Sequence, residues 1–136
     1  MLRRALKGIN FYQMGVICVI CGAPATDMHE CFVNRGAVMQ RIKDERREIN
    51  SIYNVVPLCN HCNLNITHKG EVKARQAKLV SVGLEYVIEC HANPGDYTDE
   101  QLMKYGADIV QSWIDELGLR AHQSVAALAE LEVKDE

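Results

Sequence analysis

The stretch Asn54-Val-Val-Pro-Leu-Cys59-Asn-His-Cys62-Asn63 decides the fold, because it leads an apolar run directly into a Cys-x-x-Cys pair. A second pair of the same spacing, Cys18-x-x-Cys21, comes earlier, and 37 residues separate the two pairs. Each pair can direct two thiolates at one point, and two pairs complete the tetrahedral shell that Zn²⁺ prefers. We therefore predict a structural zinc ion on Cys18, Cys21, Cys59 and Cys62, with no open position for substrate.

The total of six cysteines also raises the alternatives of disulfides or a dithiol redox site. A signal peptide is not expected, because the apolar stretch 14–21 is interrupted at Gly15 and no run is long enough to span a bilayer. We expect a cytoplasmic protein, of a bacterium or an infected host cell, where paired cysteines more often bind metal. A redox role is disfavoured because no βαβ pattern surrounds the pairs. Cys31 and Cys90 are expected to be ordinary buried thiols.

Composition indicates a soluble globular chain, with 48% hydrophobic and 24% charged residues. Residues 1–95 carry 12 Lys+Arg and 8 Asp+Glu, a balance of +4, whereas residues 96–136 carry 3 and 10, a balance of −7. A basic first part suits a phosphate-facing module, and an acidic second part suits a solvated or protein-facing helix. Charge alone supports plain solvated surface almost equally well.

Secondary structure is expected to change from strands to helices along the chain. Residues 16–20, 27–33 and 52–58 are predicted to be extended, and Asn34-Arg35-Gly36 is a turn signal. A helical segment is predicted over 64–68, with an interruption at Gly70 and a further helix over 71–79. Residues 84–89 fit a strand or a helix, and Asn93-Pro94-Gly95 breaks the pattern.

Residues 91–136 are predicted to form a helical extension. Thr98 and Gln101 form a capping box, Gly118 ends the helix that it opens, and a weaker helix follows at Val125, Leu128 and Leu131. We therefore predict an α+β chain with one domain over 1–90, its core over about 14–72, and a C-terminal helical extension over 91–136. The apolar stripe of the long helix is expected to pack on the core or to form a homodimer, and comprises Leu102, Ile109, Val110, Trp113, Ile114 and Leu117.

Taken together, the run Cys18-x-x-Cys21-Gly22, then His29-Glu30, then the stretch from Asn54 to Asn63 resembles the HNH endonucleases of the ββα-metal type. The similarity is to phage and bacterial members stapled by two Cys-x-x-Cys knuckles, and it covers roughly residues 14–72. Asn54 matches the central Asn of the motif. Cys62-Asn63 is similar to the same dipeptide in phage junction-resolving recombination endonucleases, where Asn replaces the usual His as a metal ligand.

The resemblance implies a metal-dependent DNA endonuclease with catalytic residues His29, Glu30 and Asn54. It also implies Mg²⁺, Mn²⁺ or another divalent ion on His29, Asn63 and His68, in addition to the structural zinc. Such an ion would stabilise charge on the phosphate and on the leaving oxygen. A side chain at the end of the first strand would take a proton from water, and Asn54 would hold the loop that carries this base.

Two departures from the family pattern leave alternatives open. Family members usually carry Asp-His or His-His, where this chain has His29-Glu30. We favour His29 as the ligand and Glu30 as the base; in the other register His29 is the base and Met28 falls on the ligand position, where a thioether does not suit a hard cation. His68 also lies one residue beyond the common spacing from Asn63. The alternative function is a catalytically inactive, zinc-stapled nucleic-acid-binding or scaffold module.

DNA is the expected partner, and no membrane is. The basic side chains placed to contact phosphates would position the backbone without reading sequence. Interleaved acidic residues at 44, 45 and 48 equally fit a salt-bridged exposed loop. The predicted DNA contacts are Arg35, Arg41, Lys43, Arg46, Arg47 and Lys73.

Overall fold

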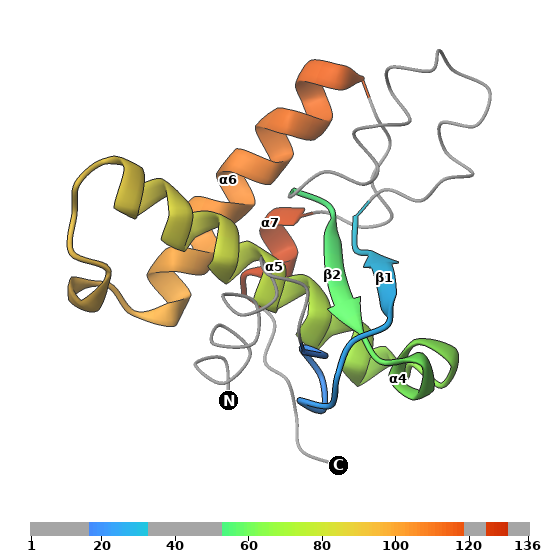
Figure 1. Cartoon of the computed structure of the whole chain (residues 1–136). Helices are drawn as coiled ribbons and strands as arrows, with labels where there is room; N and C mark the ends of the chain where they lie inside the picture. The colour runs from blue at the N-terminus through green and yellow to red at the C-terminus, as the bar shows by residue number, and fades with distance from the viewer. Residues whose placement is uncertain (1–16, 33–52, 119–124, 131–136) are drawn as a thin grey trace.

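The computed structural model describes residues 17–32, 53–118 and 125–130. Within these ranges the chain is α+β, as predicted, with a two-stranded sheet followed by helices (Figure 1). The described part has no helix that is both long enough and apolar enough to cross a membrane. The elements are β1 (Asp27–Glu30), β2 (Val55–Leu58), α4 (Asn60–Leu64), α5 (His68–Glu89), the 3-10 turn η1 (Pro94–Asp96), α6 (Asp99–Leu117) and α7 (Val125–Leu128).

The two strands pair antiparallel, with Asp27 opposite Leu58 and His29 opposite Val56. The extended segments predicted over 27–33 and 52–58 are thus confirmed in part, each as a four-residue strand. The strand predicted over 16–20 is wrong in its described part, where Ile17 makes only an isolated bridge. The chain must turn here to aim two sulfurs at one point. Gly22, at φ +82, donates its N–H to the carbonyl of Cys18 at 2.9 Å.

Helix α5 is longer than the sequence predicted, because the break falls before Gly70 and not at it. Helix α4 ends at Leu64, and Thr67 caps α5 by accepting the N–H of Gly70 at 3.0 Å. The open choice for residues 84–89 is decided in favour of helix, since α5 continues to Glu89. A single 22-residue helix therefore covers both the segment predicted over 71–79 and the open segment 84–89.

Helix α6 begins and ends as predicted. Thr98 accepts the N–H of Gln101 at 3.1 Å, and Gln101 accepts the N–H of Thr98 at 2.8 Å, so the capping box is complete. Gly118 adopts the left-handed conformation at the C-cap. The weaker last helix is confirmed as the short α7, whereas Leu131 lies outside the described residues.

Helices α5 and α6 approach closely at two glycines. A Cβ on Gly83 of α5 would lie 1.9 Å from the carbonyl oxygen of Leu102, and a Cβ on Gly106 of α6 would lie 1.8 Å from that of Leu79. The contact is reciprocal, so each helix packs its glycine on the backbone of the other. Only a residue without a side chain permits this separation.

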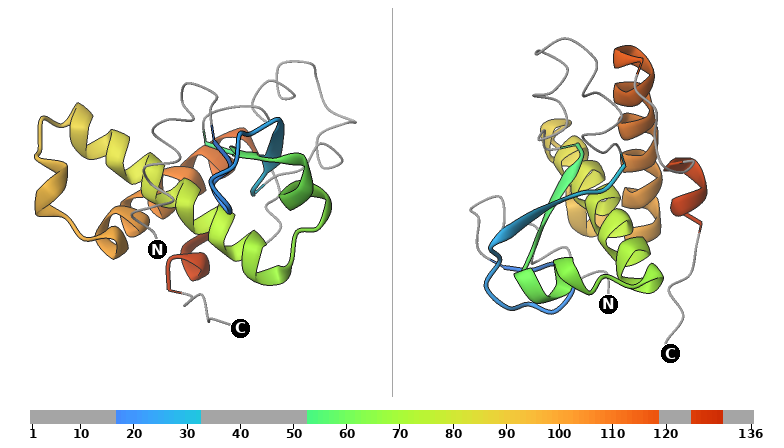
Figure 2. Two further views of the ribbon diagram at one scale, coloured as in Figure 1. Left: turned by 60° about the horizontal axis from the view of Figure 1, so that its bottom comes forward. Right: turned by 90° about the vertical axis from the view of Figure 1, so that its right-hand side faces the viewer.

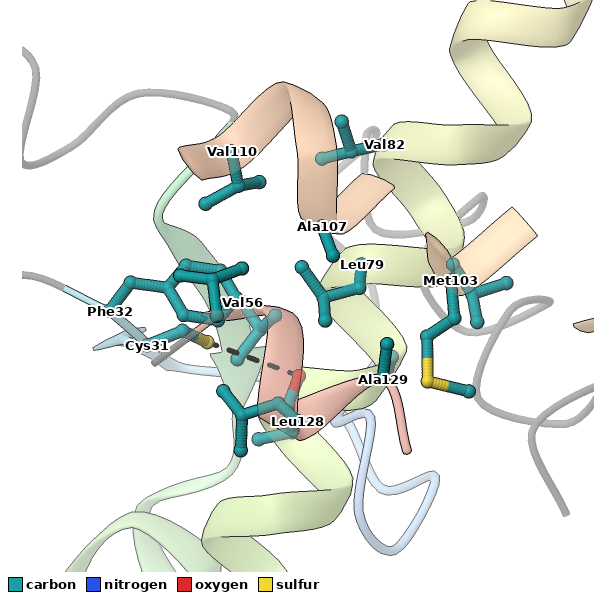
Figure 3. Close-up of a cluster of buried hydrophobic side chains, with 14 of the residues drawn as sticks. Cys31, Phe32, Val56, Leu79, Val82, Met103, Ala107, Val110, Leu128 and Ala129 are labelled. Carbon is teal, nitrogen blue, oxygen red and sulfur yellow. Dashed lines mark hydrogen bonds between the residues drawn. The ribbon is translucent and has the colours of Figure 1, made fainter. Parts of the chain in front are cut away.

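The core joins both halves of the chain in one cluster (Figure 3). Side chains from the two residues after β1, from β2 and from α5 meet those of α6 and α7 there. In the right-hand view of Figure 2 the strands and α6 lie on either side of α5. Most of the predicted stripe on α6 is buried within the chain, at Leu102, Val110, Trp113 and Ile114, with Ile109 partly buried. The side chain of Leu117 is not among those that the structure describes.

Candidate metal centre and active site

The sulfur atoms of Cys18, Cys21, Cys59 and Cys62 all lie within 4.8 Å of one another. Those of Cys21 and Cys59 are 3.6 Å apart. A tetrahedral zinc with Zn–S bonds of about 2.3 Å needs sulfur atoms about 3.8 Å apart, so the set fits the ion. In the described part of the chain no other group of three or more His, Cys, Asp or Glu ligand atoms converges in this way. The structure therefore brings the predicted zinc ligands together.

Two knuckle turns place these sulfurs. The first knuckle is bound to β2, because Val19 donates its N–H to the carbonyl of Pro57 at 3.1 Å. In the second, Cys59 caps α4 and its sulfur accepts the N–H of Cys62 at 3.4 Å. The local turns set the direction of each pair, and the sheet sets the distance between them.

The surroundings of the sulfurs favour the thiolate at Cys18 and disfavour it at Cys21 and Cys62. Burial acts to raise the pKa of Cys18, but backbone N–H groups of Cys21, Cys59 and Ile20 outweigh it and lower the pKa to about 7. Burial and the neighbouring cysteine sulfurs raise the pKa of Cys62. Four thiolates this close repel one another, and a bound divalent cation removes that cost.

A second polar cluster forms where β1 faces α5. The Nε2 atom of His29 lies 2.7 Å from Oε2 of Glu71, and Oε1 of the same carboxylate lies 2.7 Å from Nη2 of Arg75. Arg75 also donates from Nε to the carbonyl of Cys31 at 2.8 Å. His29 Nε2 is buried and makes no aligned hydrogen bond within the described chain, although it lies close to the carboxylate of Glu71.

Asn54 is fully buried and ties the two strands together at their far end. Its side-chain oxygen accepts the N–H of Phe32 at 2.9 Å, and its carbonyl accepts the N–H of Cys31 at 2.7 Å. The side chain therefore holds the segment that follows β1, at Phe32, three residues after His29. This is a positioning contact, and Asn54 itself is closed to solvent.

Oxygen and amide groups gather at the opposite end of the strands. Asn63 donates from Nδ2 to Oδ2 of Asp27 at 3.0 Å, Asn60 donates to the same oxygen at 3.3 Å, and Thr26 donates to Oδ1 at 3.0 Å. The hydrogen bonds from Asn63, Thr26 and Asn60 lower the pKa of Asp27. Its carboxylate is thus ionised at neutral pH and lies beside the first residue after the second knuckle.

The remaining predicted site residues are placed as follows. Glu30 is half-buried and adjacent to His29, so strand alternation turns the two side chains to opposite faces of the sheet. His68 is exposed at the start of α5. Lys73, a predicted DNA contact, donates from Nζ to the carbonyl of Ile20 at 3.0 Å and so ties α5 to the first knuckle. The other predicted DNA contacts, Arg35, Arg41, Lys43, Arg46 and Arg47, lie outside the described residues.

The two unpaired cysteines differ. Cys31 is fully buried, as predicted, and burial raises its pKa to about 12, so the thiol is inert near neutral pH. The prediction that Cys90 is buried is wrong, because it lies exposed at the C-cap of α5. This end of α5 lies at the surface, so the side chain of Cys90 does not reach the core.

Glu71 was not predicted as a site residue. The i, i+4 spacing of Glu71 and Arg75 was visible, but it is equally typical of an exposed helical ion pair. Only the packing of α5 against β1 reveals that the pair faces His29.

No protein family model, no curated protein and no solved structure matches this chain. Function is therefore inferred from the residues and from their geometry.

Proposed function

We propose that this chain is a metal-dependent DNA endonuclease that hydrolyses phosphodiester bonds at an HNH-type site centred on His29. The observation that carries the proposal is the 2.7 Å contact between His29 of β1 and Glu71 of α5. At its other end β1 pairs Asp27 with Leu58, the residue before Cys59. A hairpin that meets a helix beside a four-cysteine cluster is the arrangement that the sequence resemblance implies. The ββα-metal core is part of this proposal.

His29 is the residue we assign to proton transfer. Its ring lies against a carboxylate, which stabilises the imidazolium that forms when His29 takes a proton from the attacking water. Glu30, the favoured base in the sequence interpretation, lies on the opposite face of the strand and is not assigned this role. Asn54 holds the backbone that leaves β1 and so limits the movement of His29.

Asp27 and Asn63 are the residues we assign to the catalytic divalent ion. Strand alternation puts Asp27 on the same face as His29, two residues away, and Asn63 lies within 3.0 Å of its carboxylate. Carboxylate and amide oxygens are the donors that Mg²⁺ and Mn²⁺ prefer. Bound there, the ion would supply Lewis-acid stabilisation of the charge on the phosphate and on the leaving oxygen. With His29 as the base, the sequence motif places Met28 at the metal-ligand position, where a thioether does not suit a hard cation. Asp27 supplies a carboxylate ligand in its place.

The test incubates zinc-loaded protein with supercoiled plasmid and with a branched DNA, in the presence of Mg²⁺ or Mn²⁺. We expect metal-dependent nicking that His29→Ala abolishes while its zinc content stays at the wild-type value. Asp27→Ala should raise the metal concentration needed for half-maximal nicking, because it removes the charged ligand.

The matched control is His91→Asn, because His91 is exposed beyond the end of α5, roughly 30 Å along the helix from Glu71. Asparagine tolerates the positive φ that His91 adopts, so the control tests the loss of an imidazole alone. Nicking that persists in His29→Ala would overturn the assignment of the centre. Intact DNA with every metal and both substrates would favour the alternative, an inactive zinc-stapled binding module.

A further inference from the structure

The side chains that face His29 from α5 form a two-point clamp. Arg75 is only 7% exposed, and it contacts both the carbonyl of Cys31 and the carboxylate of Glu71. Glu71 in turn contacts the ring of His29. A buried guanidinium with both ends engaged has little freedom, so it fixes the carboxylate relative to the backbone that leaves β1.

A structural ion pair would not need this arrangement. A Glu and Arg at i, i+4 on an exposed helix face stabilise a helix by about 0.2–0.5 kcal/mol and gain nothing from contact with a strand. Here one carboxylate oxygen goes to Arg75 and the other to His29, each at 2.7 Å. The Glu71 carboxylate therefore contacts both the permanently charged guanidinium of Arg75 and the ring of His29, which becomes positive only when it takes a proton.

We infer that Glu71 and Arg75 are positioning residues for His29. The inference rests on the proposed function, since it concerns the proton that His29 takes during cleavage. Glu71 balances the charge of the imidazolium as it forms, and Arg75 holds Glu71 in place for this. Neither residue contacts the DNA in this scheme, so both act on the rate of the chemical step and not on substrate binding.

The experiment compares Glu71→Gln with Glu89→Gln. Glutamine has the shape of glutamate and keeps an oxygen for Arg75, so the fold should persist with wild-type zinc content and melting temperature. Glu89 is the matched control, because it is exposed at the far end of the same helix. Loss of a carboxylate that supports a metal-ligating histidine typically costs 10–100-fold in metal affinity or activity, and we use the same scale for His29. We expect a loss of about that size in the single-turnover cleavage rate at saturating enzyme, with an unchanged half-saturating concentration.

Two further readouts separate positioning from plain stability. The ring nitrogen resonances of ¹⁵N-labelled His29, recorded without added divalent ion, should shift in Glu71→Gln and stay unchanged in Glu89→Gln. Arg75→Lys keeps the charge but cannot reach both Cys31 and Glu71, so its cleavage rate should lie between those of the wild type and Glu71→Gln.

The outcomes that contradict the inference are distinct from those that contradict the nuclease. Wild-type cleavage by Glu71→Gln would overturn the positioning role, and so would a reduced rate that came entirely from a raised half-saturating concentration. Unshifted His29 resonances would overturn the contact itself, whether or not DNA is cut. A wild-type protein that cuts no DNA, with resonances that still respond to Glu71, would overturn the endonuclease and leave the contact standing.

Discussion

The knuckle and hairpin region, residues 17–32 and 53–67, and the pair of long helices α5 and α6 are stabilised by different means. The first has two strands of four residues each, too little sheet to be stable by itself in water. Four converging cysteines can supply the missing stability through one ion. The second has helices of 22 and 19 residues that bury apolar side chains and pack backbone on backbone. The first region can thus depend on metal ligands in addition to its share of the core, whereas close packing alone stabilises the second.

The largest expected effect is that of Cys59→Ser on the first region. Removing one of four ligands should expel zinc, and structural zinc contributes on the order of 10 kcal/mol of apparent binding free energy. We expect zinc content to fall from one ion to none and the hairpin to lose order, while helical circular dichroism from α5 and α6 persists at low temperature.

Cys90→Ser is the control for this change, because Cys90 is exposed and is not one of the four clustered cysteines. Full zinc and an unchanged melting curve in Cys59→Ser would refute the structural site. Loss of all helical signal would break the comparison, because the helices would then depend on zinc as well.

The next largest effect is expected at the helix crossing. Gly83→Ala or Gly106→Ala would drive a methyl group into a backbone carbonyl, so the helices must separate. We expect each to lower the free energy of unfolding by about 3 kcal/mol, the upper end of the usual cost of overpacking, as measured by urea denaturation.

Gly70→Ala serves as the matched control, since its nearest neighbour would be at 3.4 Å, an ordinary contact. Alanine is favoured over glycine in a helix by about 1 kcal/mol, so this variant should be neutral or slightly more stable. Stabilisation by all three substitutions would mean that the helices do not touch at the glycines.

A smaller effect is expected from Asn54→Ala, which removes a buried acceptor from the hairpin. The N–H of Phe32 would lose its partner, at a cost of about 2 kcal/mol in the free energy of unfolding. Zinc content should not change. Asn93 makes the same kind of bond to Gly95 at the surface, so Asn93→Ala should cost well under half as much. Equal costs would show that burial of the Asn54 contact is unimportant.

The smallest effects are expected at the two threonine caps. Thr67 begins α5 just after the knuckle region, and Thr98 begins α6. Replacing either with alanine should lower the free energy of unfolding by about 1 kcal/mol. A much smaller loss at Thr67 than at Thr98 would indicate that the knuckle region already orients the first turn of α5. Thermal melts of the two variants, with zinc bound in both, make the comparison.

Predictions from sequence succeeded wherever the signal was local and chemically specific. Each Cys-x-x-Cys pair, the capping box at Thr98 and the stop at Gly118 depend on residues within a few positions of one another. Predictions failed where one local signal was overruled by another. Gly70 was read as a break, yet Thr67 caps the helix ahead of it. The β-branched run over 16–20 suggested a strand, yet the knuckle needs a turn there.

The candidate active site was predictable only in part. His29 and Asn54 stand out by their spacing from the cysteines, and the structure places both at the sheet. The choice between His29 and Glu30 depends on which face of β1 each occupies, and that depends on how β1 pairs with β2. Five of the six predicted DNA contacts lie outside the described residues, so they stay predictions.

By itself, the sequence determined the two Cys-x-x-Cys pairs and the ends of α6, because a knuckle or a cap is complete within a few residues. Only the tertiary structure decided that Glu71 and Arg75 face His29, that Asp27 meets Asn63, and that α5 and α6 cross at Gly83 and Gly106. The physical reason is that each of these contacts joins separate elements. Their geometry depends on how helices and strands pack, and no spacing along the chain records that packing.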